Sequence, residues 1–167
     1  MDRLRLLFSS VFSQEPLSIL PITGSASNRQ YYRLSADGFS CIGVVGVDVK
    51  ENQAFIHLAR HFASKGINVP EVLACSEDEM AYLLSDLGND ALFDLYGKAV
   101  KTGEGIEVVE DLLCKTMESL PKIQFKGAED LNFENCTSVK RFDRRLVMFD
   151  LNYFKYCFLM PSGLEID

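Results

Sequence analysis

The sequence has little positive charge, and its lysines and arginines are scattered rather than clustered. Lysine and arginine number 17 against 24 acidic residues, which gives a formal net charge of −7. Binding to nucleic acid or to an anionic membrane surface generally requires a concentrated basic patch. The charge pattern therefore argues against either of these as the main task of the chain.

Long apolar runs and paired cysteine motifs are also missing. No apolar run approaches the roughly 20 residues of a membrane span, and the N-terminal apolar turn is too short for a secretory signal. The five cysteines, at positions 41, 75, 114, 136 and 157, are widely spaced and form no CxxC pair. Widely spaced cysteines of odd number favour reduced thiols, so we expect a cytoplasmic protein without membrane contact.

With 47% hydrophobic residues, the chain can bury a core, and its 167 residues suit one medium domain or two small lobes. The first half reads as β-β-β-α-β-β after a short amphipathic helix at 3–13. Strands are expected at 17–22, 30–34, 39–47, 70–75 and 80–84, with Pro21 marking an edge strand and Asp37-Gly38 a hairpin turn. A helix is expected at 49–65, because Asp48 and Glu51 have the spacing of a capping box and Lys65-Gly66 supplies a stop.

The second half has helical periodicity instead. A short helix at 91–96 is followed by a polar linker at 98–105 and a helix at 106–120. Residues 121–138 read as loop. A long helix at 139–160 then carries two apolar stripes, one through Phe142 and Phe149, the other through Phe154 and Phe158. The fold class is therefore α+β, an antiparallel sheet with one packed helix followed by a helical part.

Two short stretches are candidates for chemistry. The small residues of the run Gly24 to Arg29 let backbone amides converge on an anion, and Arg29 could add a charge; a plain β-turn accounts for the run equally well. Leu83 to Gly88 joins the strand-rich half to the helical half, where ligand clefts are common and backbone groups without a ladder partner can pair with a flat heterocycle. A simple domain hinge is the alternative.

Other polar residues favour structural roles. His57 and His61 have the spacing of two metal ligands on a helix, but no third ligand is evident, so we predict no metal site. Glu51 could pair with a lysine that holds phosphates, although its position in the capping box already explains it.

In order and spacing, these motifs together resemble the aminoglycoside phosphotransferase and choline kinase-like family of small-molecule kinases. The resemblance covers about residues 15–98 and, less closely, 139–160. Its motifs are the nucleotide loop (24–34), the link from helix to strand four (66–74), the hinge (83–88) and the first long helix of the second lobe (142–159).

The resemblance implies a bilobal, protein-kinase-like fold that transfers the γ-phosphate of ATP, with Mg²⁺, to a hydroxyl of an amino sugar, sugar, choline or aminoglycoside. Residues 1–85 would form the nucleotide-binding lobe, and residues 86–167 the hinge with an incomplete helical lobe. The implied nucleotide-binding residues are Gly24, Ser25, Ser27, Asn28, Arg29, Ser85, Asp86, Leu87 and Gly88.

Two departures from the family pattern matter. The third strand has no lysine where the family usually has one, the nearest being Lys50, and the HxD…N catalytic loop and metal-binding Asp do not occur. No catalytic residue or metal ligand can be assigned, so we expect an ATP-binding portion with negligible transferase activity. The alternative is a non-catalytic, pseudokinase-like interaction protein. We also expect self-association through 139–160, because only one of its apolar stripes can pack on the 106–120 helix.

Overall fold

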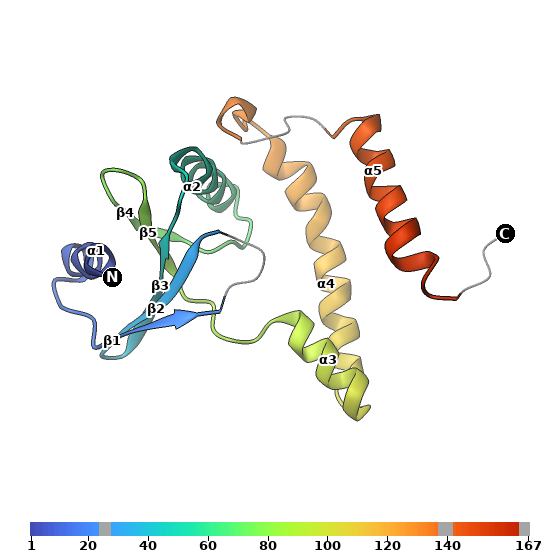
Figure 1. Cartoon of the computed structure of the whole chain (residues 1–167), viewed down its shortest axis with the longest axis horizontal. Helices are drawn as coiled ribbons and strands as arrows, with labels where there is room; N and C mark the ends of the chain where they lie inside the picture. Colours follow the sequence, from blue (N-terminus) through green and yellow to red (C-terminus); the bar gives the residue numbers. More distant parts are fainter. Residues whose placement is uncertain (24–27, 137–141, 164–167) are drawn as a thin grey trace.

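The computed structural model describes residues 1–23, 28–136 and 142–163. It begins with a helix, α1 (Asp2–Phe12), followed by β1 (Ser18–Ile22), β2 (Gln30–Ala36), β3 (Phe39–Val45), α2 (Val49–Ser64), β4 (Val72–Cys75) and β5 (Ala81–Ser85). The chain then becomes helical: α3 (Leu92–Thr102), α4 (Ile106–Gln124), two 3-10 turns η1 (Lys126–Ala128) and η2 (Phe133–Asn135), α5 (Arg144–Phe154) and a π-helical turn η3 (Lys155–Leu159). Figure 1 shows a sheet-containing half and a helical half.

The five strands form one antiparallel sheet in the order β1-β2-β3-β5-β4. The α+β class, the antiparallel sheet and the edge position expected from Pro21 are confirmed. Asp37 and Gly38 form the turn between β2 and β3, and Gly38 has a positive φ of 82°, which glycine adopts without strain. Local turn chemistry therefore sets the register of the central hairpin.

Alternation along the strands divides the sheet into two buried faces. On one face Leu34, Cys41 and Leu83 pack with Leu4 and Phe8 of α1. On the other face Val44, Tyr82 and Leu84 pack with Ile56 of α2. The expectation of a single packed helix is therefore wrong. The N-terminal helix covers the second face of the sheet, which lies between α1 and α2 (Figure 1).

Helix α2 begins and ends as its sequence predicts. The Asp48 side chain accepts a hydrogen bond from the Glu51 backbone N–H at 3.0 Å, which caps the first turn. Gly66 follows the last turn with φ 68°, so the capping residues define the ends of this helix.

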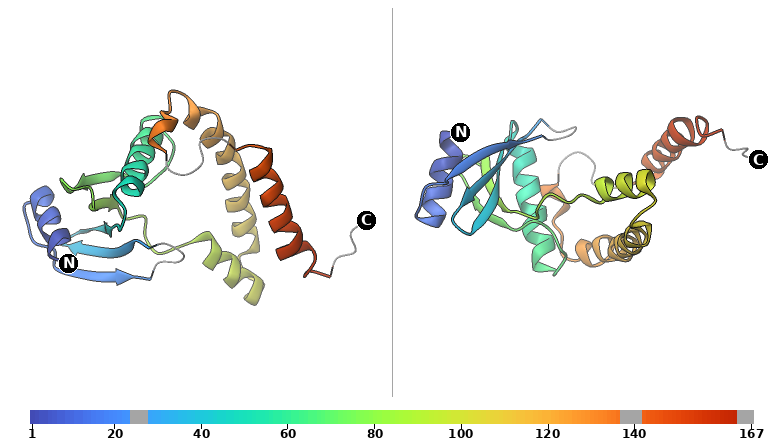
Figure 2. Two further views of the ribbon diagram at one scale, coloured as in Figure 1. Left: turned by 45° about the horizontal axis from the view of Figure 1, so that its top comes forward. Right: turned by 90° about the horizontal axis from the view of Figure 1, so that it is seen from below.

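The helical half differs from the expected boundaries. Helix α3 continues to Thr102, so residues 98–102 are helix rather than linker, and Gly103 ends it in a left-handed conformation. Helix α4 nevertheless runs through Pro121 to Gln124. Pro121 cannot donate a helical hydrogen bond, but the turn after it still closes, because Phe125 donates to the Pro121 carbonyl at 2.9 Å. The turned views show α3 and α4 side by side (Figure 2).

The segment after α4 returns to α2. His61 Nε2 lies 2.9 Å from the Gly127 carbonyl oxygen, and Lys65 pairs with Asp130 at 3.0 Å. Gly127 lies against Phe62 and Ile67 so closely that an added Cβ would meet them at 3.0–3.3 Å. The two halves are therefore joined both by the β5–α3 connection and by this return.

The last helix is shorter and less covered than expected. It begins at Arg144, where the Asp143 side chain caps it, and it becomes a π-turn after Phe154; residues 137–141 lie outside the described part. No residue of α5 or η3 is buried. Both apolar stripes are mostly exposed, although Leu146 and Val147 are partly covered. The expectation that one stripe packs on α4 is therefore wrong for the described residues. None of the described helices has the length and apolar character needed to cross a membrane.

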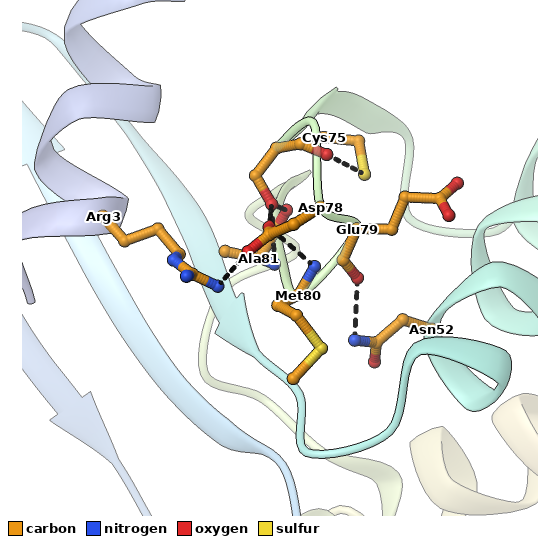
Figure 3. Close-up of polar contacts among 8 residues, drawn as sticks. Arg3, Asn52, Cys75, Asp78, Glu79, Met80 and Ala81 are labelled. Carbon is orange, nitrogen blue, oxygen red and sulfur yellow. Dashed lines mark hydrogen bonds and ion pairs between the residues drawn. The ribbon is translucent and has the colours of Figure 1, made fainter.

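Asn52, on the first turns of α2, fastens this helix to the turn between β4 and β5. Its side chain is fully buried, and its Nδ2 donates to the Glu79 carbonyl at 2.9 Å (Figure 3). In the same turn, the Asp78 carboxylate accepts from Ser76 Oγ and pairs with Arg3 of α1 at 2.8 Å. One turn thereby contacts both covering helices.

Gly46 has no side chain, and this leaves the space that the Asn52 amide occupies. A Cβ on Gly46 would come within 2.1–2.5 Å of the Asn52 side-chain amide, which its hydrogen bond holds in place. We predict that Gly46→Ala lowers the free energy of unfolding by about 2–4 kcal/mol. In an Asn52→Ala background the same change should cost under about 1 kcal/mol, because the clash is gone. Urea unfolding of the four proteins measures this coupling.

Gly97 provides the matched control, since nothing lies within 4 Å of its Cβ position in α3. Gly97→Ala should be neutral or stabilising by up to about 1 kcal/mol. Equal costs of Gly46→Ala in both backgrounds would show that Asn52 is not the group it meets.

Candidate functional site

The connection from β5 to α3 lines a pocket together with the sheet face that α2 covers. Its volume is about 320 Å³, at the low end of the range typical of small-molecule sites. The lining residues are Ile22, Arg33, Ile42, Pro70, Leu84, Ser85, Asp86, Leu87, Gly88 and Asn89. The four residues predicted from the connecting stretch thus lie together at one pocket, although Ser85 belongs to the end of β5.

Asp86 and Arg33 form the polar end of this pocket. Arg33 of β2 donates to both carboxylate oxygens of Asp86, Nε to Oδ2 at 2.6 Å and an Nη to Oδ1 at 3.0 Å. The same guanidinium reaches the Gly88 carbonyl at 3.0 Å and the Asn89 side-chain oxygen. Paired donors in a planar fork fix direction as well as distance. Arg33 therefore fixes the first residues of the connection relative to the sheet.

The pKa of Asp86 reflects these contacts. Burial, which leaves 8% of its side chain exposed, would by itself raise the pKa of the carboxyl. Hydrogen bonds from Arg33, from Ser40 Oγ at 2.6 Å and from the Gly88 N–H at 2.9 Å reverse that effect and hold the pKa at about 2. Asp86 is therefore a fixed anion that positions its neighbours, and it is already engaged by protein donors.

Ser85 and Leu87 differ in what their polar groups do. The Ser85 N–H donates to the Glu71 carbonyl and its hydroxyl accepts from the Glu71 N–H, each at 2.9 Å, so Ser85 ties the residues before β4 to β5. The Leu87 backbone, by contrast, makes no hydrogen bond within the described part of the chain, and its side chain is exposed. Leu87 therefore offers a backbone donor and acceptor beside the pocket.

The walls of the pocket are apolar and come from several elements. Ile22 of β1, Ile42 of β3 and Leu84 of β5 face it, and Pro70 closes one side. Apolar walls with a few backbone polar groups suit a flat heterocycle, which is apolar on its faces and polar at its edge.

The other predicted group lies at the opposite end of β2. Gly24, Ser25 and Ser27 are outside the described residues, whereas Asn28 and Arg29 are described. Arg29 Nη2 donates to the Glu51 backbone carbonyl at 3.2 Å, and the guanidinium lies 5.3 Å from the centre of the Phe55 ring. The Glu51 carboxylate is 3.8 Å away. The Glu51 N–H thus takes part in the helix cap, as its position predicts, and its carboxylate lies beside an arginine rather than a lysine.

Two groups in the sheet have strongly shifted pKa values, Tyr82 on the face that packs on α2 and Cys41 on the face that packs on α1. Burial raises the pKa of Tyr82 to about 12; the nearby Arg29 cation opposes this effect, whereas Glu51 adds to it. The Tyr82 hydroxyl makes no hydrogen bond within the described residues. Burial, and secondarily Asp86, raises the pKa of Cys41 to about 11. A thiol of that pKa is protonated at neutral pH and is a poor nucleophile. The described residues contain no group of three or more His, Cys, Asp or Glu side chains placed to hold a metal ion.

Sequence reasoning missed Arg33, Ser40 and Asn89. A signal for Arg33 was present, because Tyr31 and Arg33 alternate along β2 and so share one face. No local pattern links Arg33 to Asp86, which lies 53 residues further along the chain. Compared with known proteins, the sequence matches no protein-family model, and no curated protein matches it at a significant level.

The Asp86 carboxylate should stabilise the fold in a pH-dependent way. Its folded pKa of about 2 is below the ordinary value, so its contribution is complete above pH ~4 and is lost as pH falls toward about 2. We predict that Asp86→Asn lowers the free energy of unfolding by about 2–3 kcal/mol at pH 7, because Arg33 loses its charged partner. The deficit should shrink between pH ~4 and ~2. Denaturant unfolding across this range measures it.

Asp90→Asn is the control, since this neighbouring exposed carboxylate makes no hydrogen bond or ion pair within the described residues. It should leave stability within about 0.5 kcal/mol of wild type at every pH. A deficit of Asp86→Asn that stays constant down to pH ~2 would mean that the charge of Asp86 is not the stabilising feature.

Proposed function

We propose that this chain binds a purine nucleotide, ATP, in the pocket beside the β5–α3 connection, as the nucleotide-binding portion of a small-molecule phosphotransferase. The observation that carries the proposal is the combination of Ile22, Ile42 and Leu84 walls with the unpaired Leu87 backbone groups at the pocket edge. Together they suit the faces and the hydrogen-bonding edge of adenine. The resemblance to small-molecule kinases supplies the rest of the proposal: the phosphoryl group would go to a hydroxyl of an amino sugar, a sugar, choline or an aminoglycoside.

The two proposed cofactors differ in how well the described residues fit them. The pocket offers ATP an apolar slot for its base, whereas no described carboxylate cluster could hold the Mg²⁺ that accompanies its phosphates. The only histidines, His57 and His61, belong to α2, and His61 bonds the Gly127 carbonyl. The proposal is therefore limited to nucleotide binding, with no step of phosphoryl transfer assigned to these residues.

Nucleotide binding can be tested with a ligand and with a variant whose side chain fills the pocket. We predict that saturating ATP or adenosine raises the melting temperature of the wild-type chain, by roughly 5–10 °C at 100 times the Kd. Ile22→Trp should abolish the shift, because the indole occupies the space between β1 and the connection. Thermal unfolding with and without ligand gives both results.

Leu17→Trp is the matched control, since Leu17 is an exposed aliphatic residue that comes just before β1 and does not line the pocket. It should keep the wild-type shift. If millimolar adenosine and ATP shift none of the proteins, or if Ile22→Trp responds as wild type does, the pocket is not the base site.

A second candidate function is that of a non-catalytic interaction protein, and the exposure of α5 specifically favours it. Phe154 and Phe158 stack at 5.2 Å between ring centres, and both are exposed, as are Phe149 and Tyr153. Full burial of an exposed phenylalanine is worth roughly 1.5–3 kcal/mol, and these rings, about half to two-thirds exposed, forgo part of it each. Several of them together favour association. The proposed partner is a second copy of the chain.

This candidate predicts a concentration-dependent assembly. We expect the wild-type chain to associate at tens of micromolar, and Phe154→Glu with Phe158→Glu to shift it to monomer while the sheet-containing half stays folded. Sedimentation velocity and circular dichroism measure the two properties. Phe93→Glu, which places the same charge on an exposed aromatic position of α3, should leave the association unchanged. A wild-type monomer at this concentration would show that α5 does not drive assembly.

A further inference from the structure

Two arginines with different surroundings lie on and just before β2: Arg33 within the strand and Arg29 immediately before its first residue. Arg33 lies at the connection, where both carboxylate oxygens of Asp86 accept from it, so its charge is balanced within the protein. Arg29 lies four residues earlier, just before β2, where it contacts α2; four residues of extended chain span about 13 Å. That separation is comparable with the length of an extended nucleoside triphosphate. A nucleotide whose base lies at the connection would therefore bring its phosphates toward Arg29.

Strand β3 supplies no cation to the sheet face that α2 covers. Its residues on this face are Ser40, which is bonded to Asp86, and the apolar Ile42 and Val44. The nearest following lysine, Lys50, is exposed on the first turn of α2. Charge that stabilises bound phosphate must therefore come from elsewhere than β3.

The side chain of Arg29 is held in place from α2. The Glu51 carbonyl accepts its Nη2 hydrogen bond at 3.2 Å, the Phe55 ring lies under the guanidinium at 5.3 Å, and the Glu51 carboxylate is 3.8 Å away. Only 17% of the Arg29 side chain is exposed, against 56% for Glu51. An oriented, largely desolvated guanidinium interacts strongly with an anion, and its planar fork matches two phosphate oxygens.

We propose that Arg29 is the phosphate-binding cation of this site, taking the place of a lysine from β3, and that Glu51 is its positioning residue. The inference rests on the proposed nucleotide binding. It specifies which part of the ligand lies near Arg33 and which part lies near Arg29. The base lies at the connection fixed by Arg33, and the phosphates lie at Arg29. The ligand class is nucleoside di- or triphosphate rather than nucleoside.

The test measures the contributions of the base and of the phosphates to binding separately. Adenosine, ATP and inorganic tripolyphosphate are titrated by calorimetry into the full chain and its variants at two ionic strengths. Arg29→Met should weaken the binding of ATP and of tripolyphosphate roughly 10- to 100-fold, because each ligand loses charge-assisted hydrogen bonds to its phosphate oxygens. The affinity for adenosine should stay within about twofold of wild type. It should also flatten the salt dependence of ATP binding. Glu51→Gln should cause a smaller loss in the same direction.

Two further variants keep the outcome interpretable. Lys50→Met removes a positive charge from the same region and should leave all three affinities within about twofold, because Lys50 is exposed. Arg29→Lys retains the charge but not the planar fork, so its affinities for ATP and tripolyphosphate should lie between those of wild type and Arg29→Met. Arg29→Lys also replaces Arg29→Met if circular dichroism shows that Arg29→Met does not fold.

Each result decides between the two proposals. ATP binding that survives Arg29→Met unchanged, or a loss shared equally by adenosine, overturns the role of Arg29 while nucleotide binding stands. Tripolyphosphate binding that depends on Arg29, without adenosine binding, overturns the base pocket and leaves the phosphate site. A wild-type chain that binds none of the three probes overturns both.

Discussion

The bidentate pairing of Arg33 with Asp86 is the interaction on which the candidate site depends. It joins the middle of β2 to the first residue after β5, at distances of 2.6 and 3.0 Å, and it extends to Gly88 and Asn89. A connection between two differently built halves would otherwise have many accessible conformations. Because Asp86 also accepts from Ser40 and from the Gly88 N–H, the backbone around Leu87 is fixed beside the pocket. The polar groups of this connection are preorganised rather than assembled by the ligand.

The pocket also depends on the second covering helix, which our sequence interpretation did not place. Leu4 and Phe8 of α1 bury the face of the sheet opposite the pocket, with Leu34 and Leu83. An added Cβ at Gly43 would lie 2.6 Å from Leu34 and 3.0 Å from Leu4, so the packing on that side is close. With one face satisfied by α1, the other face is only partly covered by α2. Ile22, Ile42 and Leu84 can therefore line an open pocket beside the connection without leaving the core incomplete.

The features that the sequence predicted well are those with local causes. Asp37-Gly38 specifies the hairpin, and Asp48 with Glu51 specifies the start of α2, because in each case the hydrogen-bonding partners lie within a few residues. The pairing of Arg33 with Asp86 and the packing of α1 join residues far apart in the chain, and a one-dimensional pattern does not contain them. Pro121 illustrates the opposite error: residues 121–138 read as loop because their local pattern has no helical period, yet α4 continues through Pro121 to Gln124. The sequence predicted that Leu83 to Gly88 joins the two halves. It did not predict the pairing of Arg33 with Asp86 that fixes the shape of this connection.

The two halves of the chain differ in how their apolar residues are used, and this separates the two candidate functions physically. In the sheet-containing half the large apolar side chains cluster in two cores, whereas α5 and η3 expose theirs and bury none. Every described residue of the candidate nucleotide site belongs to the sheet-containing half, the first turns of α2 or the β5–α3 connection. The aromatic residues that favour association lie at the other end of the sequence, on a helix outside both cores. A change in the association state need not alter the pocket, because no described residue of α5 lines it, and a nucleotide in the pocket would contact none of the exposed α5 side chains. The two proposed functions therefore use separate parts of the chain, and one does not exclude the other.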